Sequence, residues 1–166
     1  MEERIDIMKK LNIKGNEYTL EYSFMAAEHK ETVQKMFNIV SGAYILKQAQ
    51  KANEEDIANA MFDGTSEMVA DIPNIVKTCF YSGLLENHNL KEDKSYELMK
   101  TYMKENKISY KKLFDDIKEC MEDDGFFDLS GLTEMMEEMN NQMEESMEEK
   151  TPKTPQDHKK KSIGTK

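Results

Sequence analysis

The stretch DIPNIVKTCFYSGLLENHNLKEDKSYELMKTYMKENKISYKKLFDDIKECMEDDGFF, residues 71–127, carries the most regular apolar pattern in the chain and decides the expected fold. In three successive segments, apolar residues recur at steps of three and four, which places them on one face of a helix. The three faces are Ile72, Ile75, Val76, Cys79, Phe80 and Leu84; then Tyr96, Met99, Tyr102 and Met103; then Tyr110, Leu113, Phe114, Ile117, Cys120 and Met121. Short polar joints separate the segments, so we expect three helices that pack into a core.

The residues before this stretch predict a β-hairpin and further helices. Two β-prone runs flank the turn sequence Lys14-Gly15-Asn16, so we expect a hairpin within residues 5–22 that rests one face on the helices. Phe24 to Gln50 has the composition and the apolar spacing of one helix. Capping residues predict the remaining boundaries, namely a helix over residues 53–63 that ends at Asp63-Gly64, and helix starts at Asp71-Ile72-Pro73, at Asn89 and at Ser109.

The composition limits the class of protein. A chain of 166 residues with 38 % hydrophobic and 34 % charged residues suits one helical domain with a strongly solvated surface. No apolar run approaches the roughly 20 residues that cross a bilayer, so we expect no membrane association. The start Met1-Glu2-Glu3-Arg4 lacks the features of a signal peptide, which favours a cytosolic location. Cys79 and Cys120 lie on apolar helix faces, so free buried thiols are expected rather than a disulfide or a metal site.

The charge is distributed unevenly along the chain. The net charge is −10, and residues 150–166 carry six Lys and one Asp, or +5, which leaves −15 for residues 1–149. An acidic body argues against a nucleic-acid-binding domain, because phosphate binding depends on clustered Lys and Arg. The basic tail is expected to be disordered, and weak binding of polyanions by the tail is the alternative.

Residues 129–149 predict an acidic amphipathic helix rich in methionine. From Met121 to Glu149 there are 11 acidic residues and no basic one. An apolar stripe with alternating steps of three and four can pack on the protein's own core or on a second copy. Methionine also adapts to varied partners, which suits a binding surface equally well, so both interpretations stay open. The candidate partner-binding residues are Leu129, Leu132, Met135, Met136, Met139, Met143 and Met147.

Motifs for catalysis or cofactor binding were sought and not found. Ser41-Gly42 and Ser82-Gly83 lack the strand and the Lys of a phosphate-binding loop, and no nucleophile elbow occurs. His29, His88 and His158 are not at metal-ligand spacing, and His88 is expected to be a solvated loop residue. Aligning Gly125 or Gly131 with the sixth position of a calcium-binding loop leaves the required acidic ligands missing. We therefore expect neither an enzyme nor a bound metal or cofactor.

The sequence as a whole predicts a mainly α fold: a helical bundle-like domain with a small N-terminal β-hairpin over residues 1–128, the acidic methionine-rich helix over residues 129–149, and the basic tail over residues 150–166. Most of residues 11–132 also resembles a known family, the tail assembly chaperones of long-tailed bacteriophages and related prophages. The residues that carry this resemblance are Ile13–Leu20 leading into Ser23-Phe24, Gly64–Asn74, Phe80–Glu86 and Cys120–Phe127.

The resemblance implies a specific role. Members of this family bind the tape-measure protein before the tail tube forms around it, keep it soluble and help to recruit the tail tube protein. They act in the host cytoplasm and are absent from the mature virion. The resemblance brings no catalytic residues. The methionine-rich stripe is expected to cover helices of the tape-measure protein or, alternatively, neighbouring copies of the chain along it. Two alternatives remain, namely a structural adaptor retained in the particle and a regulatory protein that binds nucleic acid through residues 150–166.

Overall fold

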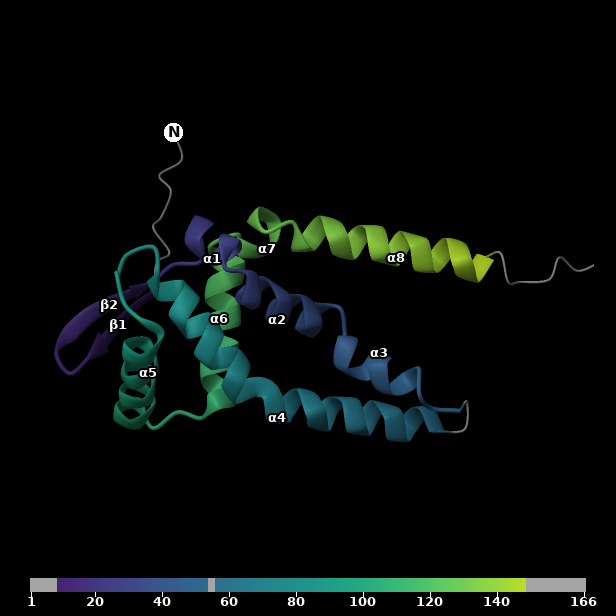
Figure 1. Ribbon diagram of the computed structural model, residues 1–166, viewed down its shortest axis with the longest axis horizontal. Coiled ribbons are helices and arrows are strands. Elements are labelled where there is room, and N and C mark those ends of the chain that lie inside the picture. Colours follow the sequence, from purple (N-terminus) through teal and green to yellow (C-terminus); the bar gives the residue numbers. More distant parts are fainter. Residues whose placement is uncertain (1–8, 54–55, 149–166) are drawn as a thin grey trace, which may run out of the picture.

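The computed structural model describes residues 9–53 and 56–148, and it confirms a mainly α fold with an N-terminal hairpin (Figure 1). Residues 5–8 of the predicted hairpin and the predicted basic tail, 150–166, lie outside the described residues. None of the described helices combines the length and the apolar composition that crossing a bilayer requires. The elements are β1 (Lys9–Ile13), β2 (Asn16–Leu20), α1 (Phe24–Glu28), α2 (Lys30–Val40), α3 (Ala43–Ala49), α4 (Ile57–Leu84), α5 (Glu92–Asn106), α6 (Tyr110–Asp123), α7 (Phe126–Leu129) and α8 (Leu132–Glu148).

The hairpin forms where the turn sequence predicts it. Strands β1 and β2 pair antiparallel, with Ile13 opposite Asn16. Lys14 and Gly15 both have positive φ, 52° and 78°, which is the geometry of the tight turns that match the twist of a hairpin. Leu11 and Leu20 are buried on the face that lies against the helices, while β1 contacts α5 and β2 contacts α4. The helices thus supply the support that an isolated hairpin lacks.

Helix α4 organises the core. The apolar residues predicted for its C-terminal half are all buried, and α4 contacts both α5 and α6. The backbone N–H of Glu21 donates to the carbonyl of Gly83 at 2.8 Å, which fastens the end of the hairpin to the end of α4. The predicted faces of α5 and α6 also turn inward, with Met99 and Ile117 exposing no more than 1 % of their surface. The three-helix core predicted over residues 71–127 is therefore confirmed, with α4 as its central member.

The predicted break between residues 63 and 71 is wrong. One helix of 28 residues, α4, runs from Ile57 to Leu84 and contains Pro73 in its interior. Proline removes one backbone hydrogen bond and normally ends or bends a helix. Pro73 is exposed, so the carbonyl that loses its partner lies on the side where water can reach it. The helix bends part-way along its length instead of ending (Figure 1).

The predicted single helix over residues 24–50 is also wrong, because two residues interrupt it. His29 has an extended conformation and begins α2 as its cap, where its ring Nδ1 accepts from the Thr32 N–H at 3.3 Å. Gly42 has φ +66° and separates α2 from α3. The predicted start at Asn89 is displaced, since Lys91 is the residue before α5. Ser109 is confirmed as the cap of α6, with its Oγ accepting from the Lys112 N–H at 3.2 Å.

Gly64 allows α3 to lie directly on α4. A Cβ atom at this position would be 2.7 Å from the Ile45 Cα, which is a backbone atom that cannot rotate away. We predict that Gly64→Ala lowers the stability of the α3–α4 pair by about 1–3 kcal/mol through overpacking. The overpacking outweighs the gain in helix propensity, about 1 kcal/mol, that replacement of Gly by Ala brings. Ser66→Ala, at an exposed position of the same helix, makes a smaller propensity gain without overpacking and is the control. Faster amide exchange over residues 43–70, with unchanged exchange in α6, is the expected result.

Candidate functional site

Helix α8, the methionine-rich helix, is anchored at its N-terminal end. Gly131 has φ +78° and turns the chain between α7 and α8. Leu132 is buried in the core at 5 % exposure, and the Thr133 Oγ1 donates to the Asp128 Oδ1 at 2.7 Å. The most extensive contacts of α8 are with α7 and α2. The rest of the helix projects away from the core (Figure 1).

The candidate partner-binding residues do not share one environment. Leu132 is an anchor in the core, so as placed it cannot cover a partner. Met136 and Met139 are half-buried, and the side chain of Met147 lies outside the described residues. The remaining three are exposed, namely Leu129 at 44 %, Met135 at 48 % and Met143 at 51 %. We call Leu132, Met136, Met139 and Met143 the methionine face, because helical periodicity places them on one side of α8.

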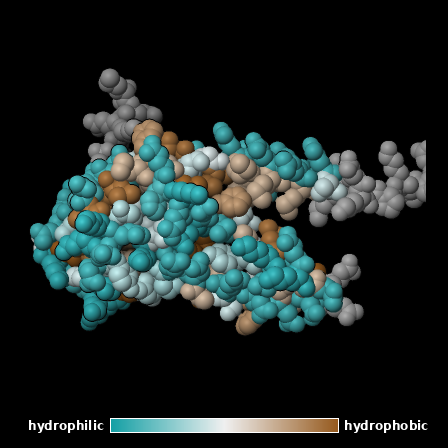
Figure 2. Space-filling model, in the orientation of Figure 1, coloured by the Kyte–Doolittle hydropathy of each residue, from teal (hydrophilic) through white to brown (hydrophobic). Residues whose placement is uncertain are grey.

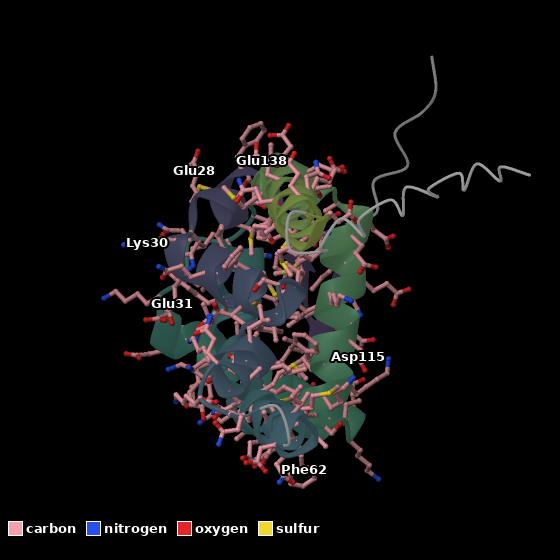
Figure 3. All side chains as sticks on the ribbon, turned by 90° about the vertical axis from the view of Figure 1, so that its right-hand side faces the viewer. Glu28, Lys30, Glu31, Phe62, Asp115 and Glu138 are labelled. Carbon is pink, nitrogen blue, oxygen red and sulfur yellow. The ribbon has the colours of Figure 1, made fainter. Side chains whose placement is uncertain are left out.

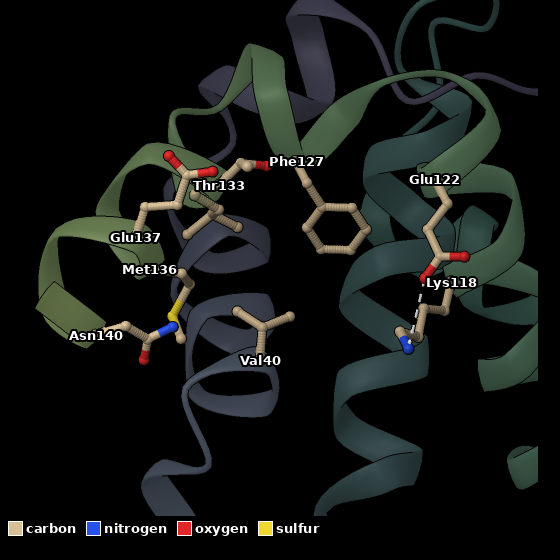
Figure 4. A pocket seen from close by; sticks show the side chains of 9 residues that line it. Val40, Lys118, Glu122, Phe127, Thr133, Met136, Glu137 and Asn140 are labelled. Atoms are coloured by element: carbon tan, nitrogen blue, oxygen red, sulfur yellow. Dashed lines mark ion pairs between the residues drawn. The ribbon is translucent and has the colours of Figure 1, made fainter. Parts of the chain in front are cut away.

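A cavity of about 340 Å³ lies beneath the methionine face (Figure 4). Met136 points from α8 toward Val40 of α2, and the ring of Phe127 lies beside them. Lys118 and Glu122 of α6 form the polar side of the cavity and pair with each other at 3.5 Å. The cavity therefore has an apolar surface beneath Met136, and the basic residue that lines it, Lys118, is paired. Its lining residues are Val40, Lys118, Glu122, Phe127, Leu132, Thr133, Met136, Glu137 and Asn140.

A second cavity, of about 700 Å³, also borders Leu132 at the N-terminal end of α8. It is formed between α2 and the α7–α8 turn, with Val33 and Phe37 on α2 and Met135 on α8. The sequence did not assign α2 to the site, although Val33, Phe37 and Val40 lie on one apolar side of that helix. The width of the apolar stripe on α2 could have indicated the contact, because it exceeds what packing against one neighbouring element requires. Its lining residues are Glu31, Val33, Gln34, Lys35, Phe37, Asn38, Ser130, Gly131, Leu132 and Met135.

Two arms project from the same side of the core. One is α8, and the other, the α3–α4 arm, consists of α3 with residues 57–71 of α4. The space-filling view shows an open hollow between them (Figure 2). Glu138 on α8 and Phe62 on α4 lie at opposite outer edges when the arms are viewed end-on (Figure 3). Phe62 thus lies on the side of its arm that is turned away from α8.

The α3–α4 arm is held together by polar contacts. Tyr44 donates its hydroxyl to a carboxylate oxygen of Asp71, and the Gln48 side chain donates to Glu67 at 2.9 Å. Burial and the hydrogen bond to Asp71 together raise the pKa of Tyr44 above its usual range, so the phenol stays a donor. Leu46 lies on the opposite side of α3 and is 42 % exposed. Leu46 therefore lies on the side of α3 away from α4, and Figure 1 shows α3 between α4 and α8.

The carboxylates of α8 have no basic partners in the described part of the chain. The described ion pairs join residues of the hairpin, α2, α5 and α6, and none includes Glu134, Glu137, Glu138, Glu144 or Glu145. Uncompensated carboxylates beside an apolar face keep that face in solution and repel other acidic helices. The methionine face is therefore suited to a partner that is apolar along one side and not acidic.

The other reactive groups are used within the fold. Burial raises the pKa of the Cys79 thiol and of the Cys120 thiol to about 12, so both are protonated and unreactive near neutral pH. His88, predicted as a solvated loop residue, is instead half-buried and accepts from the Thr19 N–H at 2.9 Å through its Nε2. Among the described residues, no group of three or more His, Cys, Asp and Glu side chains has the arrangement of a metal site.

We predict that neither cysteine reacts with an aromatic disulfide reagent in the folded protein at pH 8. Both thiols are buried and free, and a thiol with a pKa near 12 supplies very little of the nucleophilic thiolate. Two equivalents are expected to react after unfolding in guanidinium chloride. Rapid reaction of either cysteine before unfolding, followed by absorbance, would contradict the buried positions.

Comparison of the chain with protein-family models, with curated proteins and with solved structures finds no match.

Proposed function

We propose that this protein is a tail assembly chaperone that binds the tape-measure protein of a long-tailed phage or prophage through the methionine face. The observation that carries the proposal is the projecting helix α8, on which Met136 and Met139 are half-buried and Met143 is 51 % exposed. A helical protein can lay its apolar side along such a surface, and methionine adapts its shape to varied side chains.

The remaining parts of the proposed role follow from the same surface and from the resemblance of residues 11–132 to this family. A tape-measure protein is long and has apolar helical stretches. A bound chaperone that shields these stretches and exposes its own carboxylates would keep the tape-measure protein soluble until the tail tube protein is recruited. Several copies would lie side by side along one tape-measure protein. The chaperone would act in the host cytoplasm and leave before the virion is complete.

Co-expression with the tape-measure protein encoded near this gene tests the proposal. We expect the tape-measure protein to be insoluble alone and soluble when this chain is present, with the two proteins purifying together through a tag on either one. A tape-measure protein whose solubility does not respond to this chain would contradict the proposal.

Two further measurements separate the alternatives. Purified virions are expected to lack this chain, and its presence there in stoichiometric amounts would indicate a structural adaptor. Binding to DNA or RNA that weakens with salt and disappears on deletion of residues 150–166 would indicate a regulatory protein.

A further inference from the structure

The hollow between α8 and the α3–α4 arm has two walls of the same charge. Helix α8 carries six Glu and no basic residue, and the α3–α4 arm carries Asp63, Glu67 and Asp71 against Lys47, a net charge of −2. Lys118, which lines the cavity beneath α8, is paired with Glu122. Both arms carry exposed apolar side chains, Met143 on α8 and Leu46 on α3.

From this arrangement we propose that the two arms form one groove for an amphipathic helix whose apolar stripe is flanked by Lys or Arg. This inference rests on the proposed function and deepens it, because it names the kind of segment that the chaperone selects in its client. The apolar stripe would lie on the methionine face and on Leu46, while the basic flanks would meet the carboxylates. Charge complementarity of this type steers a partner and excludes like-charged competitors.

The charge pattern also decides against two other occupants. The α8 helix of a second copy would bring six more Glu residues against the same wall. Residues 150–166 of the chain itself carry six Lys, but Ile163 is their only large aliphatic residue, so they match the charge and leave the methionine face uncovered. A basic amphipathic helix satisfies both requirements together.

The carboxylates on one flank of the methionine face are placed to contact the basic residues of a bound helix. Glu137 and Glu144 are seven residues apart, so they lie on the same side of α8, and Glu137 also lines the cavity beside Met136. Both are exposed and neither has an ion-pair partner among the described residues. They are positioned to pair with basic residues that border the apolar stripe of a bound helix.

Two synthetic peptides test the proposal with the full chain. They share one stripe of Leu at helical spacing, and one carries Lys on both flanks where the other carries Glu. We expect the Lys peptide to bind roughly tenfold more tightly at about 20 mM salt, with the difference falling to about threefold at 300 mM because salt screens the exposed charges. Equal affinity of the two peptides, or equal binding of a scrambled Lys peptide that lacks the stripe, would overturn the proposal.

Matched variants locate the two walls. Glu137→Gln/Glu144→Gln is expected to weaken the Lys peptide about threefold, whereas Glu92→Gln/Glu119→Gln, on α5 and α6, leaves it unchanged. Leu46→Ser is expected to weaken both peptides, whereas Phe62→Ser, on the outer edge of the arm, weakens neither. If each pair of variants behaves alike, the groove is not where we place it.

The peptide experiments and the tape-measure experiments can fail independently of each other. Peptides that do not discriminate by charge, together with a tape-measure protein that still depends on α8, would refute the basic groove and leave the chaperone role standing. Strong selection of the Lys peptide, with no effect on the tape-measure protein, would support the groove and refute that role.

Discussion

Tyr22→Ala is expected to lower the free energy of unfolding by about 3–5 kcal/mol, the range for removal of a large buried aromatic side chain. Tyr22 is fully buried where the hairpin meets α4, α6 and α7. Its hydroxyl donates to the Cys79 carbonyl at 3.0 Å, and its ring packs edge-to-face on Phe126 with the ring centres 6.3 Å apart. Gly83 fits against the same ring, since a Cβ there would be 2.6 Å from the Tyr22 Cζ.

Tyr22→Phe is the matched control, because it keeps the ring and removes only the hydroxyl. We expect a loss of about 1 kcal/mol, the usual net value of one hydrogen bond. The Cys79 carbonyl still accepts from the Ser82 Oγ at 3.1 Å, so it is not left without a donor. Urea unfolding followed by circular dichroism measures both variants. Similar losses for Ala and Phe would show that the ring does not fill the junction.

Met136→Ser/Met139→Ser/Met143→Ser is expected to weaken binding of the tape-measure protein about 50-fold. Each partly exposed methionine would lose somewhat under 1 kcal/mol of apolar burial on binding, or about 2–3 kcal/mol for the three. The free protein is expected to stay folded, because Leu132 and not these residues anchors α8 in the core.

Phe62→Ser/Val69→Ser is the control for this variant, since both residues are more than half exposed and Val69 follows Phe62 by seven residues on the outer side of α4 (Figure 3). It removes a similar amount of exposed apolar surface from the other arm and is expected to leave the affinity unchanged. Titration of each variant with one soluble tape-measure segment supplies the comparison. Equal losses for the two variants would mean that apolar surface in general, and not the methionine face, determines binding.

The parts of the fold that were predictable are those that local patterns determine. The turn Lys14-Gly15 specifies the hairpin, because its two positive φ angles are the ones that a tight hairpin turn requires. The three apolar stripes between residues 71 and 127 specify helices, because a period near 3.6 fits no other element. Ser109 marks the start of α6 through its own side-chain hydrogen bond.

The errors arise where surroundings outweigh local preference. Pro73 has the sequence environment of a helix start, yet its exposed position lets α4 continue through it. Gly42 was expected inside a helix and instead adopts φ +66°, with no neighbour within 4 Å of where its Cβ would be. Neither the exposure of Pro73 nor the open space at Gly42 can be inferred from spacing alone.

The candidate site was predictable in its residues but not in its geometry. The stripe of Leu132, Met136, Met139 and Met143 is evident from periodicity. Periodicity does not show whether an apolar residue meets the protein's own core or solvent. Here Leu132 is buried in the core, whereas Met143 is exposed to solvent. The contribution of Val40 on α2 depends on a contact between distant segments, so it required the fold.

Photo-crosslinking tests the central claim most directly. A benzophenone amino acid placed at Met143, and separately at Asp115 on the exposed side of α6, is irradiated in the complex of the full chain with the tape-measure protein. We predict a covalent adduct with the tape-measure protein from position 143 and none from position 115. An adduct from position 115 alone, or from neither position in a complex that still co-purifies, would contradict binding through the methionine face.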